Sequence, residues 1–131
     1  MTMTPNEAFT IIAARLRAMP DCPPVVWPNT NFEPVLPRLI FQQPVRGAND
    51  PTLGGGYKVR TGRAVVIVAT ALVDDFGDAA DTLATQIEAL FPTGPLPTQP
   101  AGVLTIVQSQ VLGGYQTDTD WRVPVQIDWR A

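Results

Sequence analysis

The last ten residues before the C-terminal alanine alternate between hydrophobic and polar positions. Every second residue is large and hydrophobic, and arginine, proline, glutamine or aspartate stands between: Trp121, Val123, Val125, Ile127 and Trp129 against Arg122, Pro124, Gln126, Asp128 and Arg130. A period of two is that of a strand with one face in the core. We therefore predict a strand over residues 121–130 whose hydrophobic face packs inward.

Three other segments also predict strands. Leu39-Ile40-Phe41 is a compact β-branched and aromatic stretch, and Pro37 and Pro44 mark the limits of a short strand. Residues 57–71 predict a long strand whose second half is buried on both faces, with a bulge at Gly62 between its halves. Residues 103–108 predict a strand that ends near Gly113 and forms a hairpin with residues 121–130.

Two segments have helical spacing. Thr4, Pro5 and Glu7 form a capping-box pattern, which predicts that a helix begins there and ends near Met19, with Arg15 and Arg17 on its polar face. A second helix is predicted to run to residue 91 and end at Pro92. Acidic residues precede it, and a hydrophobic stripe follows them: Asp74, Asp75 and Asp78, then Ala79, Ala80, Leu83, Ala84, Ile87, Leu90 and Phe91.

The order is therefore helix, strand, long strand, helix, strand, strand. We expect an α+β fold, with an antiparallel sheet of about four strands and two helices packed on one face. A chain of 131 residues, 45% hydrophobic and 16% charged, is expected to fold as a single domain over residues 1–131. Residues 45–56, which include Gly54-Gly55-Gly56, are predicted to form a mobile loop.

Charge and cysteine content exclude several classes of function. A net charge of −3 argues against a protein that holds nucleic acid by its phosphates. The single cysteine, Cys22, excludes an internal disulfide and a cluster of thiolate metal ligands, and with no basic neighbour it is expected to be inert. Neither a signal peptide nor a hydrophobic run long enough for a membrane span is present, so we expect a soluble protein made in the cytoplasm.

Candidate catalytic chemistry is sparse. The chain has no histidine, which removes the commonest general base and metal ligand. The carboxylates of Asp74, Asp75, Asp78 and Asp81 have the oxygen ligands that Mg²⁺ or Ca²⁺ prefers, and a metal-dependent enzyme is one alternative. Acidic residues at a helix N-terminus also offset the helix dipole, which is the structural alternative that we favour. No catalytic, cofactor or metal site is predicted.

The glycine-rich segment and the positive charges beside it have two alternatives each. Gly54-Gly55-Gly56 lacks the lysine and the following helix of a phosphate-binding loop, so we interpret it as a hinge. Lys58, Arg60 and Arg63 either face DNA or an acidic partner, or are a solvated strand end.

Several local strings, together with the order of the elements, resemble the phage tail-terminator-like family over nearly the whole chain. The strings are Trp27-Pro28-Asn29, Phe32-Glu33-Pro34, the segment from Asn49-Asp50 through Pro51-Thr52-Leu53-Gly54-Gly55-Gly56-Tyr57, residues 79–91, and Trp121-Arg122-Val123-Pro124-Val125 to Trp129-Arg130-Ala131. The second helix departs from the resemblance, because it is basic in relatives and here holds Asp78, Asp81 and Glu88 with no lysine or arginine.

The resemblance implies a structural virion protein without enzymatic activity or cofactor. Such a protein forms a ring, expected to be a hexamer, on the head-proximal end of the tail tube, where it ends tube polymerisation and joins the neck proteins while DNA passes through its lumen without specific binding. Another head-to-tail joining protein, such as a neck or stopper subunit, is the nearest alternative. The expected interface with other subunits or partners is Leu53, Gly54, Gly55, Gly56, Tyr57, Lys58 and Arg60.

Overall fold

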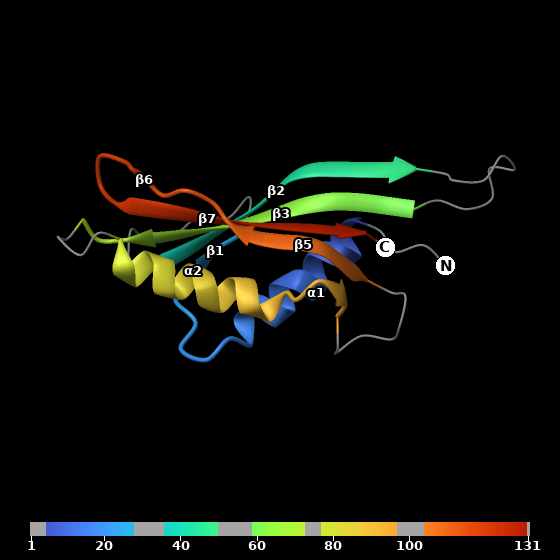
Figure 1. The fold of residues 1–131 in the computed structure, drawn as a ribbon, viewed down its shortest axis with the longest axis horizontal. Coiled ribbons are helices and arrows are strands. Elements are labelled where there is room, and N and C mark those ends of the chain that lie inside the picture. Colours follow the sequence, from blue (N-terminus) through green and yellow to red (C-terminus); the bar gives the residue numbers. More distant parts are fainter. Residues whose placement is uncertain (1–4, 28–35, 50–58, 73–76, 97–103, 131) are drawn as a thin grey trace, which may run out of the picture.

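The computed structural model describes residues 5–27, 36–49, 59–72, 77–96 and 104–130, which form two helices and a mixed sheet of seven strands (Figure 1). In chain order the elements are α1 (Pro5–Arg17), β1 (Val25–Val26), β2 (Arg38–Asn49), β3 (Val59–Thr70), α2 (Asp78–Leu90), β4 (Gly94–Pro95), β5 (Thr105–Val111), β6 (Tyr115–Gln116) and β7 (Trp121–Arg130). The α+β class is therefore confirmed.

The sheet is larger than the four strands predicted. Its order is β1-β2-β3-β7-β5-β4, β6 pairs with β7, and only β1 and β2 pair in parallel. The four long strands β2, β3, β5 and β7 correspond to the predicted ones, and the three additional strands have two residues each. Two residues are too few to show a period, so these short strands depend on the long strands beside them.

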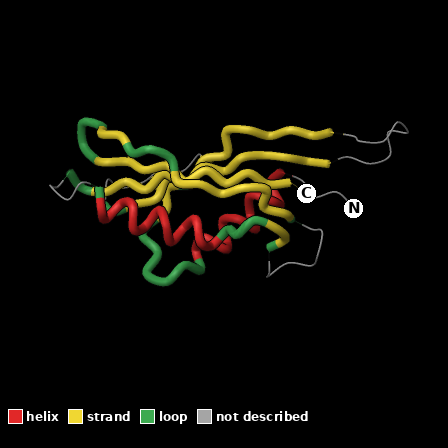
Figure 2. The backbone as a smooth tube through the Cα atoms, in the orientation of Figure 1, coloured by secondary structure: helices red, strands yellow, loops and turns green. Residues whose placement is uncertain are grey.

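β7 lies at the centre of the sheet and has the predicted alternation. Val123, Val125, Ile127 and Trp129 are each at most 1% exposed, and α1 and α2 cover that face (Figure 2). Pro124 is tolerated in this central strand because the N–H that it lacks would face the gap between β5 and β6, where the regular ladder is interrupted. Its carbonyl faces the same side and accepts the N–H of Leu112 at 2.9 Å.

Both helices supply residues to one hydrophobic core. The buried residues are Ala8, Ile12 and Leu16 from α1, and Ala80, Ala84 and Ile87 from α2. They pack against the inward-facing residues of β2, β3, β5 and β7. The opposite face of the sheet has no helix over it in the described part of the chain (Figures 1 and 2).

The prediction of a short strand ending before Pro44 was wrong. β2 continues to Asn49 because the register shifts by one residue between Gln42 and Val45, and Pro44 lies within that irregularity. A bulge is one of the few places in a strand where proline is tolerated. Residues 45–49 are therefore strand and not mobile loop, whereas residues 50–56 lie outside the described part.

The bulge predicted at Gly62 was also wrong, because β3 keeps a continuous register with β7 through this residue. Gly62 pairs with Trp129, and a Cβ atom at Gly62 would lie 2.5 Å from Cζ2 of that indole. The glycine is required because the Trp129 ring occupies the space of a side chain. The second half of β3 is almost entirely buried on both faces, as predicted, with only Val65 partly exposed.

The C-terminal end of α2 is held by side chains from two other elements. The Ser109 hydroxyl on β5 donates to the carbonyl oxygen of Phe91 at 2.8 Å, and Nε of Arg15 on α1 donates to that of Leu90. A helix leaves its last carbonyls without partners, and a cation there also offsets the dipole. Arg15 is thus partly buried, in contact with the end of α2, and does not lie on a solvent-exposed face. The guanidinium carbon of Arg17 lies 4.4 Å from the centroid of the Trp27 ring.

Candidate assembly surfaces

One end of the molecule is a two-stranded arm, which we define as residues 45–60. Residues 45–49 and 59–60 are described, and they extend β2 and β3 past the end of β7 (Figure 1). The last pair between β3 and β7 is Thr61 with Arg130, whereas β2 and β3 continue to pair beyond this point, as far as Asn49 with Val59. From Phe41 onward, the outer edge of β2 also has no strand beside it among the residues described.

The expected interface residues belong to this arm, and only Arg60 of the seven is among the residues that the structure describes. Leu53, Gly54, Gly55, Gly56, Tyr57 and Lys58 lie outside the described residues. Arg60 lies in β3, where its backbone pairs with Ala48. The assignment of these seven residues to an interface therefore stays a prediction.

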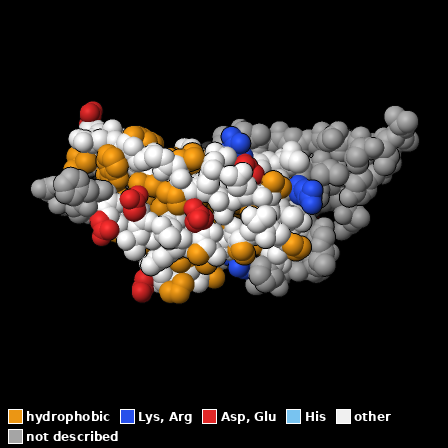
Figure 3. Space-filling model, in the orientation of Figure 1, with side chains coloured by type: hydrophobic (Ala, Val, Ile, Leu, Met, Phe, Trp, Pro, Cys, Tyr) orange, Lys and Arg blue, Asp and Glu red, His pale blue; other side chains and the backbone are white. Residues whose placement is uncertain are grey.

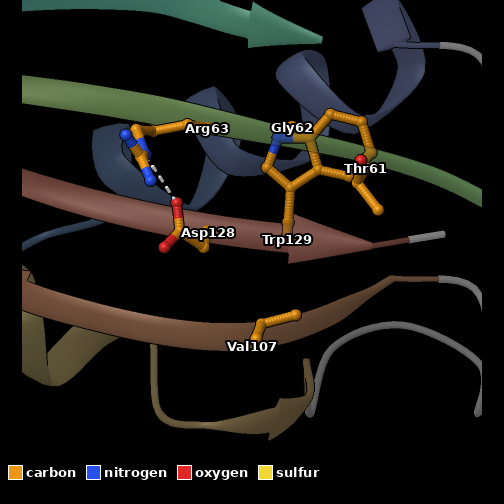
Figure 4. A pocket seen from close by; sticks show the side chains of 6 residues that line it. All are labelled: Thr61, Gly62, Arg63, Val107, Asp128 and Trp129. Carbon is orange, nitrogen blue, oxygen red and sulfur yellow. Dashed lines mark hydrogen bonds and ion pairs between the residues drawn. The ribbon is translucent and has the colours of Figure 1, made fainter. Parts of the chain in front are cut away.

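A shallow pocket of about 270 Å³ lies at the base of the arm (Figure 4). It is lined by Thr61, Gly62, Arg63, Val107, Asp128 and Trp129. Nε of Arg63 donates to Oδ1 of Asp128 at 2.8 Å, so the third member of the predicted basic patch has an acidic partner. The described lining offers no nucleophile activated by a base, since its only carboxylate is engaged with Arg63.

The opposite end is built around Trp121. Cβ atoms at Gly77 and Gly114 would lie 2.7 Å and 2.5 Å from its indole, so the start of α2 and the chain before β6 both pack on this ring. We call this region the Trp121 end and define it by Trp121, three exposed hydrophobic residues and three exposed carboxylates: Leu72, Leu112 and Tyr115 with Asp78, Asp81 and Asp118. The hydrophobic residues are 45%, 36% and 43% exposed.

The two ends differ in charge. Figure 3 shows carboxylates and hydrophobic side chains gathered over β6 and the start of α2, whereas arginine side chains on this face lie nearer the arm. The sequence has the same asymmetry. Residues 45–60 contain Arg46, Lys58 and Arg60 with one acid, Asp50, whereas residues 72–81 contain four aspartates and no basic residue.

A buried ionic cluster lies on the helix-free face near the Trp121 end. Asp120 is fully buried, and it accepts hydrogen bonds from Nε of Arg122 at 2.8 Å and from the Thr117 hydroxyl at 2.6 Å. Arg38, at the start of β2, approaches the same carboxylate at 3.3 Å. These contacts fasten the turn before β7 to a strand that is 82 residues away in sequence.

The cluster shifts the ionisation of its members. The hydrogen bond from Arg122 lowers the pKa of Asp120, and the Thr117 hydroxyl and the charge of Arg38 lower it further, against the effect of burial. The same hydrogen bond raises the pKa of Arg122. The sequence interpretation missed this cluster because Arg38 and Asp120 stand beside predicted strands. The repeat Thr117-Asp118-Thr119-Asp120 was the one available signal, since threonine and aspartate at this spacing stabilise turns.

Other candidate residues have structural surroundings. Asp78 and Asp81 lie exposed in the first turn of α2, and Asp74 and Asp75 lie outside the described residues. Over the described ranges, no three cysteine or acidic side chains come together as a metal site. Cys22 is half buried, its thiol donates to the carbonyl of Pro23 at 3.3 Å, and burial raises its pKa, which favours the unreactive thiol form.

None of the described helices is long and hydrophobic enough to cross a membrane.

Comparisons with known proteins agree with the resemblance in the sequence. The model of a family described as "Phage tail terminator protein" matches residues 8–129. One solved structure superposes on this chain with a TM-score of 0.66 and 23% sequence identity, and the superposition covers 95% of this chain and 91% of the other. At that identity it shows a shared fold alone. The search of curated proteins found no match.

Proposed function

The chain belongs to the phage tail terminator family, and from this premise we propose that it forms a ring on the head-proximal end of the tail tube. Membership makes it a structural protein of a phage tail. In our proposal the ring, expected to contain six subunits, ends polymerisation of the tube protein and provides the joining surface for a neck protein. The observation that carries the proposal is the family match, which spans all the described elements except the ends of α1 and β7.

The arm supports ring formation because it has an open backbone edge. Unpaired N–H and C=O groups on an edge strand are a template for a second chain, and the outer edge of β2, away from β3, has no strand beside it from Phe41 to Asn49 in the described part. A ring requires a head-to-tail interface whose rotation closes. We propose that Leu53, Tyr57 and Arg60, with the glycines and Lys58 between them, make this contact.

Capping a tube is a steric task. The ring must bind the last tube subunits on one side and present a different surface on the other, which requires no cofactor. The negative net charge suits a lumen through which DNA passes, because a strongly basic channel would hold the phosphates.

The proposal is tested by imaging the purified protein and virions. Leu53→Asp is expected to lower the fraction of subunits in rings at least about tenfold, because it places an unpaired charge in a contact between subunits. Val107→Asp is the matched control, since Val107 is 50% exposed on β5 outside the proposed contact. Mass photometry and negative-stain microscopy measure ring abundance. A wild-type protein that stays monomeric at high concentration, and forms no ring in particles, would contradict the proposal.

The nearest alternative is a neck or stopper subunit, which shares the structural role but not the position. Gold labelling of the protein in intact particles distinguishes them, because a terminator lies directly on the tube end. The metal-dependent enzyme is the alternative of another class. Calorimetric titration with Mg²⁺, Mn²⁺ and Ca²⁺ is expected to show no binding heat at the Asp74, Asp75, Asp78 and Asp81 carboxylates.

A further inference from the structure

We infer that the Trp121 end of one subunit is the docking site for the arm of the next copy of this chain. This inference rests on the proposed ring and names the surface that the arm contacts. A head-to-tail interface joins two different patches of the same subunit. The arm and the Trp121 end satisfy this condition, because they lie at opposite ends of the molecule (Figure 1).

The Trp121 end has the composition of the centre of an interface. Leu112 and Tyr115 flank a pair of glycines, and with Leu72 they expose more than a third of their surface to solvent. Half-buried Trp121 lies beneath the second glycine, Gly114. Tyrosine and tryptophan are enriched among the residues that contribute most of the binding free energy, and the core of an interface is more hydrophobic than its rim.

Charge selects the arm as the partner of this surface. Asp78, Asp81 and Asp118 are exposed at the Trp121 end, and Asp74 and Asp75 stand in the sequence between Leu72 and α2. The arm carries three basic residues, Arg46, Lys58 and Arg60, and one acidic residue. The arm therefore has an excess of two basic residues in a chain whose net charge is −3. Opposite potentials on two patches favour their encounter and disfavour pairing of like ends.

Local packing within the subunit preforms this docking surface. Trp121 joins the start of α2 to the chain before β6, and the buried Asp120 carboxylate fixes the turn that carries Asp118. A preformed surface loses less conformational entropy on binding than a flexible one.

Charge reversal at each end tests the contact. The arm variant is Lys58→Glu with Arg60→Glu, and the acidic-end variant is Asp81→Lys with Asp118→Lys. Each variant alone is expected to weaken self-association at least about a hundredfold, because like charges then face each other. A chain that carries all four substitutions is expected to recover assembly, since its two ends are again complementary. Gln86→Lys, at an exposed position of α2 outside both surfaces, controls for the effect of an added charge.

Mixing the two single-end variants is the sharper experiment. The arm variant keeps an intact Trp121 end and the acidic-end variant keeps an intact arm. An equimolar mixture is therefore expected to assemble with the two variants alternating, because the reversed arm of one also complements the reversed end of the other. Native mass spectrometry measures the mass and the one-to-one composition of these mixed assemblies, and circular dichroism checks that each variant is folded. Rings that form in the wild type and persist in both variants would overturn the inference while the proposed function stands. A chain with all four substitutions that stays monomeric would do the same. Mixed complexes that form open chains, together with a wild type that forms no closed rings, would support the contact and contradict the ring.

Discussion

The two ends of β7 each bury an indole against glycine, but the surfaces around these indoles differ. Trp129 is 1% exposed beside Gly62 at the base of the arm. Trp121 is half buried between Gly77 and Gly114, with exposed hydrophobic residues and carboxylates around it. At one end the core is closed and a ribbon of two strands extends from it, whereas at the other end the core continues into an accessible surface.

The difference shows how one strand supports both stability and assembly. The alternation of β7 places the two indoles on the face that the helices cover, so both packing sites come from one periodic pattern. What each end presents to solvent depends on the elements beside it. The arm comes from β2 and β3, and the Trp121 end comes from α2, β6 and the turn before β7.

The largest effect is expected from removing the buried indole. Trp129→Ala is expected to lower the free energy of unfolding by about 3–5 kcal/mol, because it leaves a large cavity in the core. Trp121→Ala is expected to cost about half as much, since that ring is partly exposed already. Urea denaturation at one fixed protein concentration measures both. Equal losses would contradict the contrast between a closed and an open end.

A double-mutant cycle sharpens the same comparison. Gly62→Ala alone is expected to cost about 1–3 kcal/mol, because its Cβ would overlap the Trp129 ring. In a Trp129→Ala background the added methyl group has room, so the cost is expected to nearly vanish. A cost that stays the same in both backgrounds would show that Gly62 is needed for another reason.

The next effect concerns the ionic cluster beside the Trp121 end. Asp120→Asn is expected to lower the free energy of unfolding by about 2–3 kcal/mol at neutral pH, because buried hydrogen bonds to charged groups are lost and Arg38 stays buried. Asp118→Asn in the same turn is the matched control, since its side chain is exposed. Chemical denaturation of the two variants in parallel measures the difference.

The pKa of Asp120 gives this prediction a pH dependence with a defined sign. Its pKa in the folded protein lies below the ordinary value of 3.8, so the unfolded chain binds the proton more readily. Its stabilisation is therefore complete above pH 3.8 and is lost as the pH falls through the lowered pKa. Wild type is expected to lose more stability in acid than Asp120→Asn, and identical acid profiles would refute the role of this carboxylate.

The smallest effect is expected between the two ends, at the C-terminus of α2. Ser109→Ala is expected to cost about 1 kcal/mol, because the carbonyl of Phe91 loses its donor. Gln108→Ala, at the exposed neighbouring position on β5, is expected to change stability by less than about 0.5 kcal/mol. Thermal unfolding of the two variants measures the difference. Similar effects would show that the Ser109 hydroxyl is not a cap.

The sequence by itself determined the long elements and which of their faces are buried. Both helices and the strands β3, β5 and β7 follow from hydrophobic periods of 3.6 and two, because a residue's face in a helix or strand depends only on its position along the element. Only the start of β2 follows from its β-branched and aromatic residues. The resemblance in the strings around Trp27, Leu53 and Trp121 likewise predicted the family that the match over residues 8–129 shows.

Only the tertiary structure decided where strands end and which distant residues meet. β2 passes Pro44 because β3 lies beside it and a bulge absorbs the proline, and Gly62 is fixed by an indole 67 positions later in the sequence. Asp120 meets Arg38 only because β2, β3 and β7 are adjacent in the sheet. Such contacts depend on strand order and register, which local periodicity does not encode.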